Sequence, residues 1–396
     1  MENYNYLYNI EKVPTLQNLL YKTPQEAQNC LIGKVQLVED LQSGLIYNIA
    51  FDEELAVYNQ NYQNEQAHSE VFQNHLSNVA NIIKPYFYNK KICEVGCGKA
   101  TFLHLLEKHN YNIFGLDPAY EGYHPLIIKK TLQETENINA EAIILRHTLE
   151  HVINPYNFLK IIKEKLSNKQ GLIYIEVPCF EWILKHNAWF DIFYEHVNYF
   201  RLSDLQNFFE VNSILTSGKL FGEQYLYIIA DLKGLKKPIY NDNNSVIKYV
   251  TNIIKTNKQT NKQTNKQTNK QTNKQTNKQT NSIIQFTKQQ FNNINELIIW
   301  GAGAKGVAFA IQRFNNGFKN DFIVDINPAK TNKYLPITAQ KVYLPEQFLL
   351  HFNTMSNAKT IIIPNSNYAE EIQQFICSFN QKHNANLLFD FLQIEA

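Results

Sequence analysis

The chain has 396 residues, of which 44% are hydrophobic and 13% aromatic, so it is neither wholly disordered nor fibrous. Its 38 basic residues nearly balance its 36 acidic ones, and six of the lysines lie in one repeat, without which the balance is 32 minus 36, or −4. The folded part is therefore not basic, which disfavours a broad contact with nucleic-acid phosphates.

The cysteines and the N-terminal residues indicate in which cellular compartment we expect the protein. The five cysteines are scattered and form no CxxC pair, so we expect no disulfide framework and no four-cysteine zinc site, and a cytoplasmic location. The N-terminal MENYNYLYNIEKVP has neither a cationic start nor an apolar run. No stretch approaches the roughly 18 apolar residues that span a membrane. These features disfavour secretion by a signal peptide and membrane insertion.

Short apolar runs alternate with amphipathic segments between residues 90 and 178. KKICEV, YNIFGLD, EAIILR and GLIYIEVP have the composition of buried strands, whereas TFLHLLEKHN and HVINPYNFLKIIKEKL have helical spacing. Alternation of this kind predicts a doubly wound parallel sheet. Near the C-terminus, NELIIW, GAGAKG, VAFAIQRF and KNDFIVDINP repeat the plan. We therefore expect an α/β protein with two Rossmann-like domains, the C-terminal one being smaller.

The chain divides into four expected parts: an N-terminal segment at 1–75, a domain at 76–235, a helical linker at 236–295 and a second domain at 296–396. Within the linker, residues 256–279 read TNKQ six times, and the repeat continues to residue 281. This tract has no apolar residue and cannot join a core. The flanking NSVIKYVTNIIK and NSIIQFTKQQFNNI have helix-like spacing behind Asn-Ser cap candidates.

The repeat also suggests a hypothesis about the gene. Under the standard code ACA-AAC-AAA-CAA encodes Thr-Asn-Lys-Gln, and these bases are repeated copies of ACAA. Gain or loss of one unit in such an array would shift the reading frame and switch off the product, which would suit a protein that decorates a cell surface. A duplicated block without a switching role is the alternative, and the DNA sequence distinguishes the two.

The first glycine turn, EVGCG, ends a strand and opens a helix. Gly96 and Gly98 let a ligand approach the backbone, and Asp117 stands 19 residues after Gly98 at the end of the next strand, where it can accept ribose hydroxyls. A dinucleotide site normally has a third glycine, but Thr101 takes that position. The turn therefore resembles the S-adenosylmethionine site of class I methyltransferases. The expected cofactor contacts are Glu94, Gly96, Cys97, Gly98, Asp117, Pro118, Arg146 and His147.

Three further motifs narrow the resemblance: LRHTLEH at 145–151, IEVP at 175–178 and DIFYEHVNYF at 191–200. With EVGCG they resemble the sugar C-methyltransferase family, which acts on nucleotide-linked keto-deoxysugars. The resemblance covers nearly the whole chain apart from the repeat. It implies an N-terminal zinc-binding segment, a central class I methyltransferase domain and a C-terminal Rossmann-like domain. It also implies an enzyme that uses S-adenosylmethionine and a nucleotide-sugar, for a surface glycan.

The chain departs from this family in the zinc-binding segment. Where the family has CxxCG before a stretch like FDEELAVYNQNY, this chain has DLQSG at 40–44, and Cys30 is the only cysteine in residues 1–75. Four soft ligands cannot be assembled from it. We therefore expect no zinc, and an N-terminal segment that keeps its shape without metal or has been remodelled.

The resemblance assigns His196 as the catalytic base, with Tyr194 and Glu195 beside it and Tyr62 closing the sugar pocket. Carbon methylation needs a base beside a ketone and a stabiliser for the enolate oxygen. Imidazole suits the first task and a phenol group, here Tyr194, the second. From the residues alone, His196 in an aromatic strand or helix start could equally be a hydrogen-bonded structural histidine.

Two other histidines, His147 and His151, are spaced like a metal-binding pair on a helix, but no third ligand is evident and we expect no metal. We expect His147 to border the cofactor and His151 to begin a helix.

The second glycine turn, GAGAKG, is a full GxGxxG, with Asp325 at the end of the next strand, 19 residues after Gly306. Alone it is a dinucleotide fingerprint. The resemblance implies instead a scaffold that helps contain the nucleotide-sugar, whose diphosphate the helix N-terminus would attract. A packed turn without ligand is the third reading. The possible nucleotide-binding residues are Gly301, Gly303, Lys305 and Gly306.

The expected function is thus C-methylation of a nucleotide-linked keto-deoxysugar. Three alternatives stay open: O-methylation of the same substrate class, a nicotinamide-dependent sugar oxidoreductase that uses the C-terminal turn, and a non-catalytic scaffold for glycan synthesis.

Overall fold

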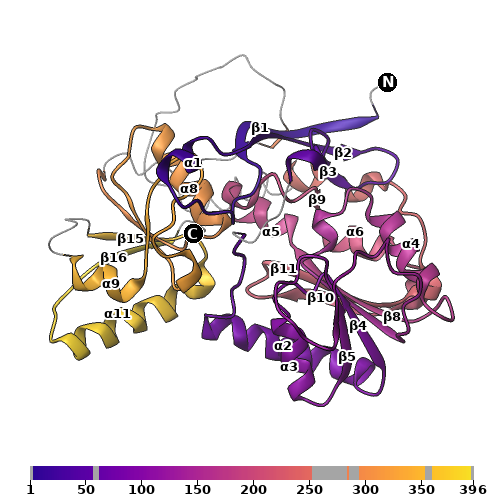
Figure 1. The fold of residues 1–396 in the computed structure, drawn as a ribbon. Coiled ribbons are helices and arrows are strands. Elements are labelled where there is room, and N and C mark those ends of the chain that lie inside the picture. Colours follow the sequence, from indigo (N-terminus) through magenta and orange to yellow (C-terminus); the bar gives the residue numbers. More distant parts are fainter. Residues whose placement is uncertain (1–2, 57–61, 252–282, 285–293, 353–358, 394–396) are drawn as a thin grey trace, which may run out of the picture.

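The computed structural model describes residues 3–56, 62–251, 283–284, 294–352 and 359–393. Residues 246–251, in the first segment expected to be helical in the linker, are helical. The TNKQ repeat lies outside the described residues, as does most of the segment after it. The described chain forms a four-stranded, a seven-stranded and a five-stranded sheet. Figure 1 shows the two larger sheets side by side, with the N-terminal sheet against the central one.

The N-terminal sheet is antiparallel and has the order β1-β2-β3-β9. Its side chains include Leu7, Val35 and Leu37, which are fully buried in a core shared with the central domain. Its last strand comes from the DIFYEHVNYF motif, so the N-terminal segment is hydrogen-bonded to the motif that carries His196. The strands are β1 (Tyr4–Pro14), β2 (Ile32–Asp40), β3 (Ile46–Asn48) and β9 (Asn198–Tyr199).

The central sheet has the order β10-β11-β8-β7-β4-β5-β6, in which the five strands from β8 to β6 are parallel and β11 is antiparallel. Its strands are β4 (Lys91–Val95), β5 (Asn112–Leu116), β6 (Ile127–Ile128), β7 (Ala142–Arg146), β8 (Leu172–Pro178), β10 (Ile214–Leu220) and β11 (Tyr225–Asp231). Its helices are α2 (Glu70–Phe87), α3 (Thr101–Lys108), α4 (Pro155–Lys165), α5 (Phe180–Lys185) and α6 (Leu202–Asn207).

Helix α2 illustrates how the sequence builds these layers. Ser69 caps it by accepting a hydrogen bond from the amide of Phe72. Phe72, Leu76, Val79 and Ile83 recur at helical spacing, and all four are buried in the core cluster that they share with residues of the sheet. The helix is therefore fixed by a cap at its start and an apolar stripe along its length.

The C-terminal lobe has a wholly parallel sheet of order β14-β13-β12-β15-β16. Both lobes thus confirm the expected α/β class with two parallel sheets. The strands are β12 (Ile298–Trp300), β13 (Phe322–Val324), β14 (Val342–Tyr343), β15 (Thr360–Ile363) and β16 (Asp390–Gln393). The helices are α8 (Ala304–Asn315), α9 (Pro345–Leu350) and α11 (Ala369–His383).

The N-terminal segment also touches the C-terminal lobe. Its short helix α1 (Pro24–Gln28) lies beside that lobe in Figure 1. Tyr21 and Tyr334 exchange backbone hydrogen bonds of 3.0 and 2.9 Å, and the amide of Ile337 donates to the carbonyl of Ala27 at 2.8 Å. The segment at 1–75 therefore ties the two α/β lobes together.

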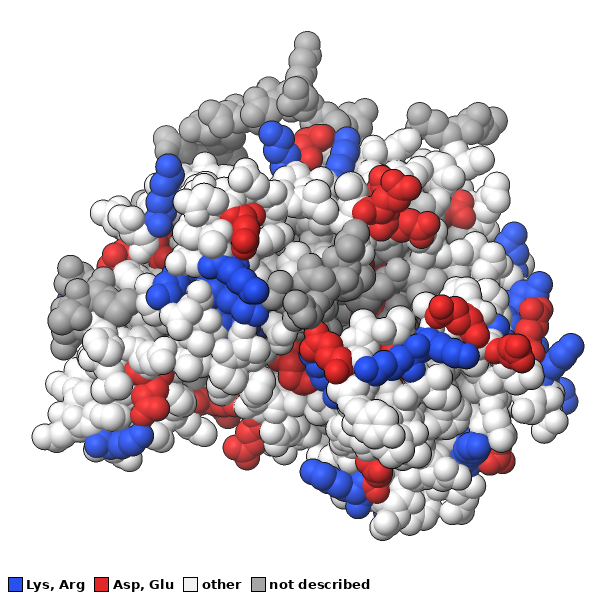
Figure 2. All heavy atoms as spheres, in the orientation of Figure 1, with Lys and Arg blue, Asp and Glu red and all other residues white. Residues whose placement is uncertain are grey.

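The surface carries no broad charge of one sign on the face that Figure 2 shows, where basic and acidic side chains are interspersed. Among the helices of the described residues, none is both long enough and apolar enough to cross a membrane.

Candidate active site

Each glycine turn follows the middle strand of five parallel strands. Strand β4 pairs with β5 on one side and β7 on the other, and β12 pairs with β13 and β15 in the same way. Connections leave such a strand in opposite directions, which opens a crevice at its carboxyl end where ligands bind in doubly wound folds. The topology therefore places both turns at ligand-binding positions.

Both turns line one cavity of about 630 Å³. This volume is typical of small-molecule sites. The expected site residues on its wall are Tyr62, Glu94, Gly96, Cys97, Gly98, Arg146, His147, Glu195, His196, Gly301, Gly303, Lys305 and Gly306. Three expected residues, Asp117, Pro118 and Tyr194, are not part of this wall. The cavity thus joins the two α/β lobes and the N-terminal segment in one site.

The EVGCG turn combines a packed glycine with an open one. Gly96 has φ +76°, and a Cβ there would lie 2.5 Å from Oγ1 of Thr148, so this position requires glycine. At Gly98 no atom lies within 4 Å of where a Cβ would stand, which leaves the space above the turn open. Thr101, which replaces the third glycine, donates a 2.7 Å hydrogen bond to Glu65 of the N-terminal segment.

Asp117 shapes the turn from outside the cavity wall. Its Oδ2 accepts a 2.7 Å hydrogen bond from the amide of Gly98, and its Oδ1 accepts one of 2.8 Å from the amide of Ala119. The side chain is therefore fixed beside the turn, as its position at the end of β5 led us to expect. The contact of Asp117 with a ribose stays a prediction. Pro118 is exposed and does not line the cavity, so its expected contact with the cofactor also stays a prediction.

Glu94 and Arg146 present two buried polar atoms to the cavity. Oε2 of Glu94 and Nε of Arg146 have no hydrogen-bond partner in the described part of the chain. Burial raises the pKa of Glu94 to about 8, although the nearby charge of Arg146 opposes this rise. An acceptor and a donor without partners are costly in a buried site unless a ligand supplies them.

Glu176 is the centre of a buried ionic network beneath this wall. Its Oε1 lies 2.9 Å from Nη2 of Arg146, 3.1 Å from Nε2 of His147 and 3.0 Å from Nε2 of His75. The hydroxyl of Tyr174 donates to Oε2 at 2.5 Å. Burial opposes its ionisation, but Arg146 and the histidines outweigh burial and hold the pKa of Glu176 well below its usual range.

His147 becomes a fixed cation in this network. Burial alone would lower its pKa, but Glu150 and Glu176 raise the pKa of His147 to about 9. Its Nδ1 lies 3.4 Å from Oε1 of Glu150, and its backbone φ is +49°. From the sequence we placed His147 beside the cofactor but did not identify Glu176 as a site residue. Its position could have been noticed, because Glu176 is an acid inside the otherwise apolar strand GLIYIEVP.

Glu195 is held by two parts of the N-terminal segment. Its Oε2 accepts a 2.5 Å hydrogen bond from the hydroxyl of Tyr62, and its Oε1 accepts one of 3.0 Å from the amide of Gln17. Burial raises the pKa of Glu195. The structure thus brings Tyr62 and Glu195 together at the cavity, and their bond fixes the backbone of the neighbouring His196.

His196 faces the cavity in its neutral form. Its side chain is packed against Phe193, with ring centroids 4.1 Å apart, and against His151, at 5.0 Å. Burial, together with the positive potential of His151, His147 and Lys305, holds the pKa of His196 well below its usual range. A neutral imidazole has a lone pair that can accept a proton.

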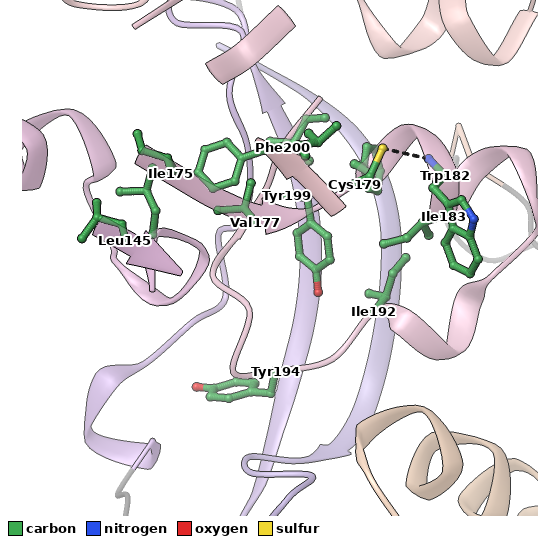
Figure 3. Packing of buried hydrophobic residues seen from close by; sticks show 14 of the residues in the cluster. Leu145, Ile175, Val177, Cys179, Trp182, Ile183, Ile192, Tyr194, Tyr199 and Phe200 are labelled. Atoms are coloured by element: carbon green, nitrogen blue, oxygen red, sulfur yellow. Dashed lines mark hydrogen bonds between the residues drawn. The ribbon is translucent and has the colours of Figure 1, made fainter. Parts of the chain in front are cut away.

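The structure corrects the expected place of Tyr194. This side chain is fully buried, away from the cavity, and its hydroxyl accepts from the amide of Asp52 at 2.7 Å and donates to the carbonyl of Asp52 at 3.0 Å. Its ring fills the space beside Gly33, where a Cβ would lie 2.3 Å from Cε2. Figure 3 shows it at the edge of a cluster of buried hydrophobic side chains. Tyr194 is therefore an anchor for the N-terminal segment.

The second glycine turn already has partners inside the protein. A Cβ at Gly306 would lie 1.8 Å from the carbonyl oxygen of Gly301, so close packing of α8 is enough to require this glycine. Asp325 accepts a 2.7 Å hydrogen bond from the amide of Ala302 and pairs with Nζ of Lys330 at 3.0 Å. The acid that a dinucleotide ribose would need is therefore engaged.

Lys305 reaches from the C-terminal lobe to the central domain. Its Nζ lies 2.9 Å from Oε1 of Gln224 and 3.3 Å from Oδ2 of Asp191, both central-domain residues. No signal in the GAGAKG motif identifies these partners, since they lie more than 80 residues away along the chain. The ion pair of Lys305 with Asp191 is therefore a contact between the two lobes at the cavity wall.

Comparison with protein families supplies the deciding observation. Residues 64–212 match the family model described as "Methyltransferase domain". The chain carries a methyltransferase domain. The matched residues include the EVGCG turn and extend past the DIFYEHVNYF motif. The enzyme class and the class I methyltransferase fold expected from the sequence are thus confirmed, whereas the sugar C-methyltransferase family is not shown.

Solved structures similar to this chain include three methyltransferases. One is a SAM-dependent methyltransferase from Archaeoglobus fulgidus, with 18% identity over 40% of this chain and 93% of that one, and a TM-score of 0.31. Another is magnesium protoporphyrin IX methyltransferase from Synechocystis with bound SAH, with 13% identity over 41% of this chain and 82% of that one, and a TM-score of 0.31. A third is a possible histamine N-methyltransferase from Thermotoga maritima, with 15% identity over 41% of this chain and 91% of that one, and a TM-score of 0.33. The curated proteins contain no match to this chain.

S-adenosylmethionine fits the polar groups of this methyltransferase domain. The methionine part of this cofactor carries an ammonium and a carboxylate, which suit the unpartnered Oε2 of Glu94 and Nε of Arg146. The open space at Gly98 lets a ligand lie directly on the turn. The residues that would hold the cofactor are therefore Glu94, Gly96, Cys97, Gly98, Arg146 and His147, with Asp117 behind them.

Proposed function

We propose that this methyltransferase acts on a nucleotide-linked keto-deoxysugar, which it methylates at carbon for a surface glycan. The observation that carries the proposal is that neutral His196 and the Gly96–Gly98 turn line the same cavity. A base beside the methyl donor is what a weakly acidic C–H acceptor requires.

The chain's own residues can carry the proton transfer. S-adenosylmethionine, when bound, supplies an electrophilic methyl group on a sulfonium. His196 would take the proton from the carbon beside the ketone. That carbon would form its bond to the methyl group as the methyl–sulfur bond breaks, with the electron pair staying on sulfur and S-adenosylhomocysteine leaving. Glu195, held by Tyr62 and Gln17, keeps the main chain at His196 in place. The proton leaves His196 for solvent when the product departs.

The negative charge that develops on the ketone oxygen needs a stabiliser other than Tyr194. His147 supports this role because it lines the cavity and its pKa of about 9 makes it a cation at neutral pH. Its ring nitrogens face Glu150 and Glu176, so it acts through its charge at short range in a buried site.

The nucleotide part of the substrate is proposed to contact the C-terminal lobe. The turn at Gly301–Gly306 and the N-terminus of α8 line the cavity that also contains His196. Exposed amides at the N-terminus of a helix favour a diphosphate. Lys305 lies beside these amides and already joins the two lobes, although Asp191 at 3.3 Å offsets part of its charge.

The structure bears on two alternatives to C-methylation, the nicotinamide-dependent oxidoreductase and the sugar O-methyltransferase. The Lys330–Asp325 pair disfavours a nicotinamide dinucleotide at the second turn, because it occupies the acid that would bind the ribose. O-methylation of a sugar hydroxyl would use the same base, so it stays the competing activity.

The test is incubation of the full chain with labelled S-adenosylmethionine and a panel of nucleotide-linked keto- and hydroxy-sugars, followed by NMR location of the new methyl group. A methyl on carbon beside the former ketone supports the proposal, and one on oxygen replaces it with sugar O-methylation. If no sugar gives a labelled product although the cofactor binds, the proposal is wrong. The chain would then either methylate a different class of acceptor or act as a non-catalytic scaffold.

A further inference from the structure

Three side chains on the cavity wall converge on one point. Glu150, His151 and His196 each offer a ligand atom, and these atoms lie within 4.8 Å of one another. Glu150 is 1% exposed, and neither of its carboxylate oxygens has a hydrogen-bond partner in the described residues. A buried carboxylate without a hydrogen bond is costly, and the ion pair of Glu150 with Nδ1 of His147 is long, at 3.4 Å, so its oxygens can still accept a second positively charged ligand.

The neighbouring contacts fix which atoms face this point. Nδ1 of His151 lies 2.7 Å from the carbonyl oxygen of Glu195, which can only accept, so Nδ1 carries the proton. Nε2 of His151 is then the nitrogen that can bind a metal. A hydrogen bond from the other ring nitrogen to a carbonyl is the usual way in which proteins orient a histidine ligand.

The tertiary structure assembles this set from two distant motifs. Glu150 and His151 belong to the 3₁₀ turn Leu149–His151 of LRHTLEH, and His196 belongs to DIFYEHVNYF. The histidine pair considered from the sequence was His147 and His151, but the cluster combines His151 with His196 and an acid. Two imidazoles and one carboxylate form a ligand set found at zinc and non-haem iron centres.

We propose that Glu150, His151 and His196 bind one divalent transition-metal ion of the Zn²⁺ class. Zinc bonds of about 2.0–2.2 Å place ligand atoms roughly 3.3–3.6 Å apart. Ligand atoms that now lie up to 4.8 Å apart must therefore approach one another by up to roughly 1.2–1.5 Å. A fourth position would face the cavity, because all three residues line it.

Charged groups of both signs surround the cluster. One positive group, His147, already contacts the cluster, with its Nδ1 3.4 Å from Oε1 of Glu150, so the ion and His147 would share this carboxylate. The charge of Lys305 is offset by Asp191 at 3.3 Å. With two imidazoles in the ligand set, the site favours an ion that forms strong bonds to nitrogen.

A bound ion would occupy the lone pair of His196. The metal-loaded chain would then lack its base, so the ion would act as an inhibitor of methyl transfer. This consequence rests on the proposed function, whereas metal binding itself does not.

The experiment is a titration of the chelator-stripped full chain with Co²⁺, followed by visible absorption, and with Zn²⁺, followed by calorimetry. We expect one tight site per chain, weakened at least tenfold in Glu150→Gln and in His151→Ala. The matched control is His104→Ala, which removes a ligand from the surface cluster His104, Glu107 and His124 and should leave the tight site unchanged. Unchanged affinity in both cavity variants, or loss in His104→Ala, would overturn the proposal.

Folding of each variant is checked by circular dichroism. Should a cavity variant not fold, X-ray absorption of the Co²⁺-loaded His104→Ala variant decides, since this variant lacks the complete surface cluster. Two imidazole ligands in it support the cavity site, and an all-oxygen shell overturns it. Zn²⁺ should abolish methyl transfer and a chelator restore it. A chain that binds metal at these residues but methylates no sugar would contradict the proposed function and leave the metal site standing.

Discussion

The ammonium of Lys330 lies 3.0 Å from Oδ2 of Asp325, and both side chains are buried. The corresponding acid of the first turn, Asp117, accepts hydrogen bonds from the amides of Gly98 and Ala119 and has no such cation among the described residues. The two turns therefore have the same outline but different chemistry, since the acid of one is neutralised and the acid of the other is not.

This pair predicts that the second turn does not bind a nicotinamide dinucleotide. Titration of the wild type with NADH, followed by its fluorescence, should show no saturable binding. Lys330→Ala should lower the free energy of unfolding by about 3 kcal/mol, because it leaves a buried carboxylate without its cation. The control Lys382→Ala breaks an exposed pair with Glu346 in the same lobe and should change stability by less than about 0.5 kcal/mol. Saturable NADH binding would restore the oxidoreductase alternative.

His196 is predicted to be the base. His196→Ala should abolish methyl transfer while S-adenosylmethionine affinity, measured by calorimetry, stays close to that of the wild type. His104→Ala, a histidine outside the cavity wall, should retain full activity. Unchanged turnover in His196→Ala would remove this residue from the mechanism.

Tyr194 and Tyr62 are predicted to have different roles, the first in stability and the second in catalysis. Tyr194→Phe loses the hydrogen bonds to Asp52 and should lower the free energy of unfolding by about 1–3 kcal/mol, with kcat unchanged. Tyr62→Phe releases the carboxylate of Glu195 at the cavity and should lower kcat. Chemical denaturation and steady-state kinetics of both variants measure this, and loss of kcat in a stable Tyr194→Phe would contradict the structural role of Tyr194.

Asp117 is predicted to support the cofactor through the turn and the ribose together. Asp117→Ala should weaken S-adenosylmethionine binding by on the order of 1 to 3 kcal/mol, through lost charge-assisted hydrogen bonds. Asp117→Asn keeps one acceptor for the Gly98 amide and should lose less. Calorimetry on both variants distinguishes the two contributions, and wild-type affinity in Asp117→Ala would mean that the ribose lies elsewhere.

Glu94 should make stability depend on pH. Burial raises its pKa from 4.5 to about 8, so the folded chain holds a proton that the unfolded chain has released. The stabilising contribution is therefore complete below about pH 4.5 and is lost as pH rises through 8, by on the order of several kcal/mol. Urea unfolding of wild type against Glu94→Gln from pH 5 to 9 should show this loss only in the wild type. Glu164→Gln, at a side chain 56% exposed, should follow the wild type.

The sequence by itself was enough for the local parts of the fold. KKICEV-GCGKA-TFLHLLEKHN is strand β4, its glycine turn and helix α3, because residue spacing and glycine freedom act over a few neighbouring positions. The position of Asp117 followed in the same way, since parallel strands end at one edge of a sheet. The second α/β lobe was equally legible from its own strand and turn signals.

The tertiary structure decided which side chains of the motifs reach the cavity. In FYEHVN, Tyr194 turns to the N-terminal sheet and His196 to the cavity, and this choice depends on where Gly33 and Asp52 pack against the motif. The Lys330–Asp325 pair and the meeting of Glu150 with His196 likewise join groups that no local spacing relates. Burial and pairing of charges are properties of the packed chain, so they alone separate an occupied acid from one available to a ligand.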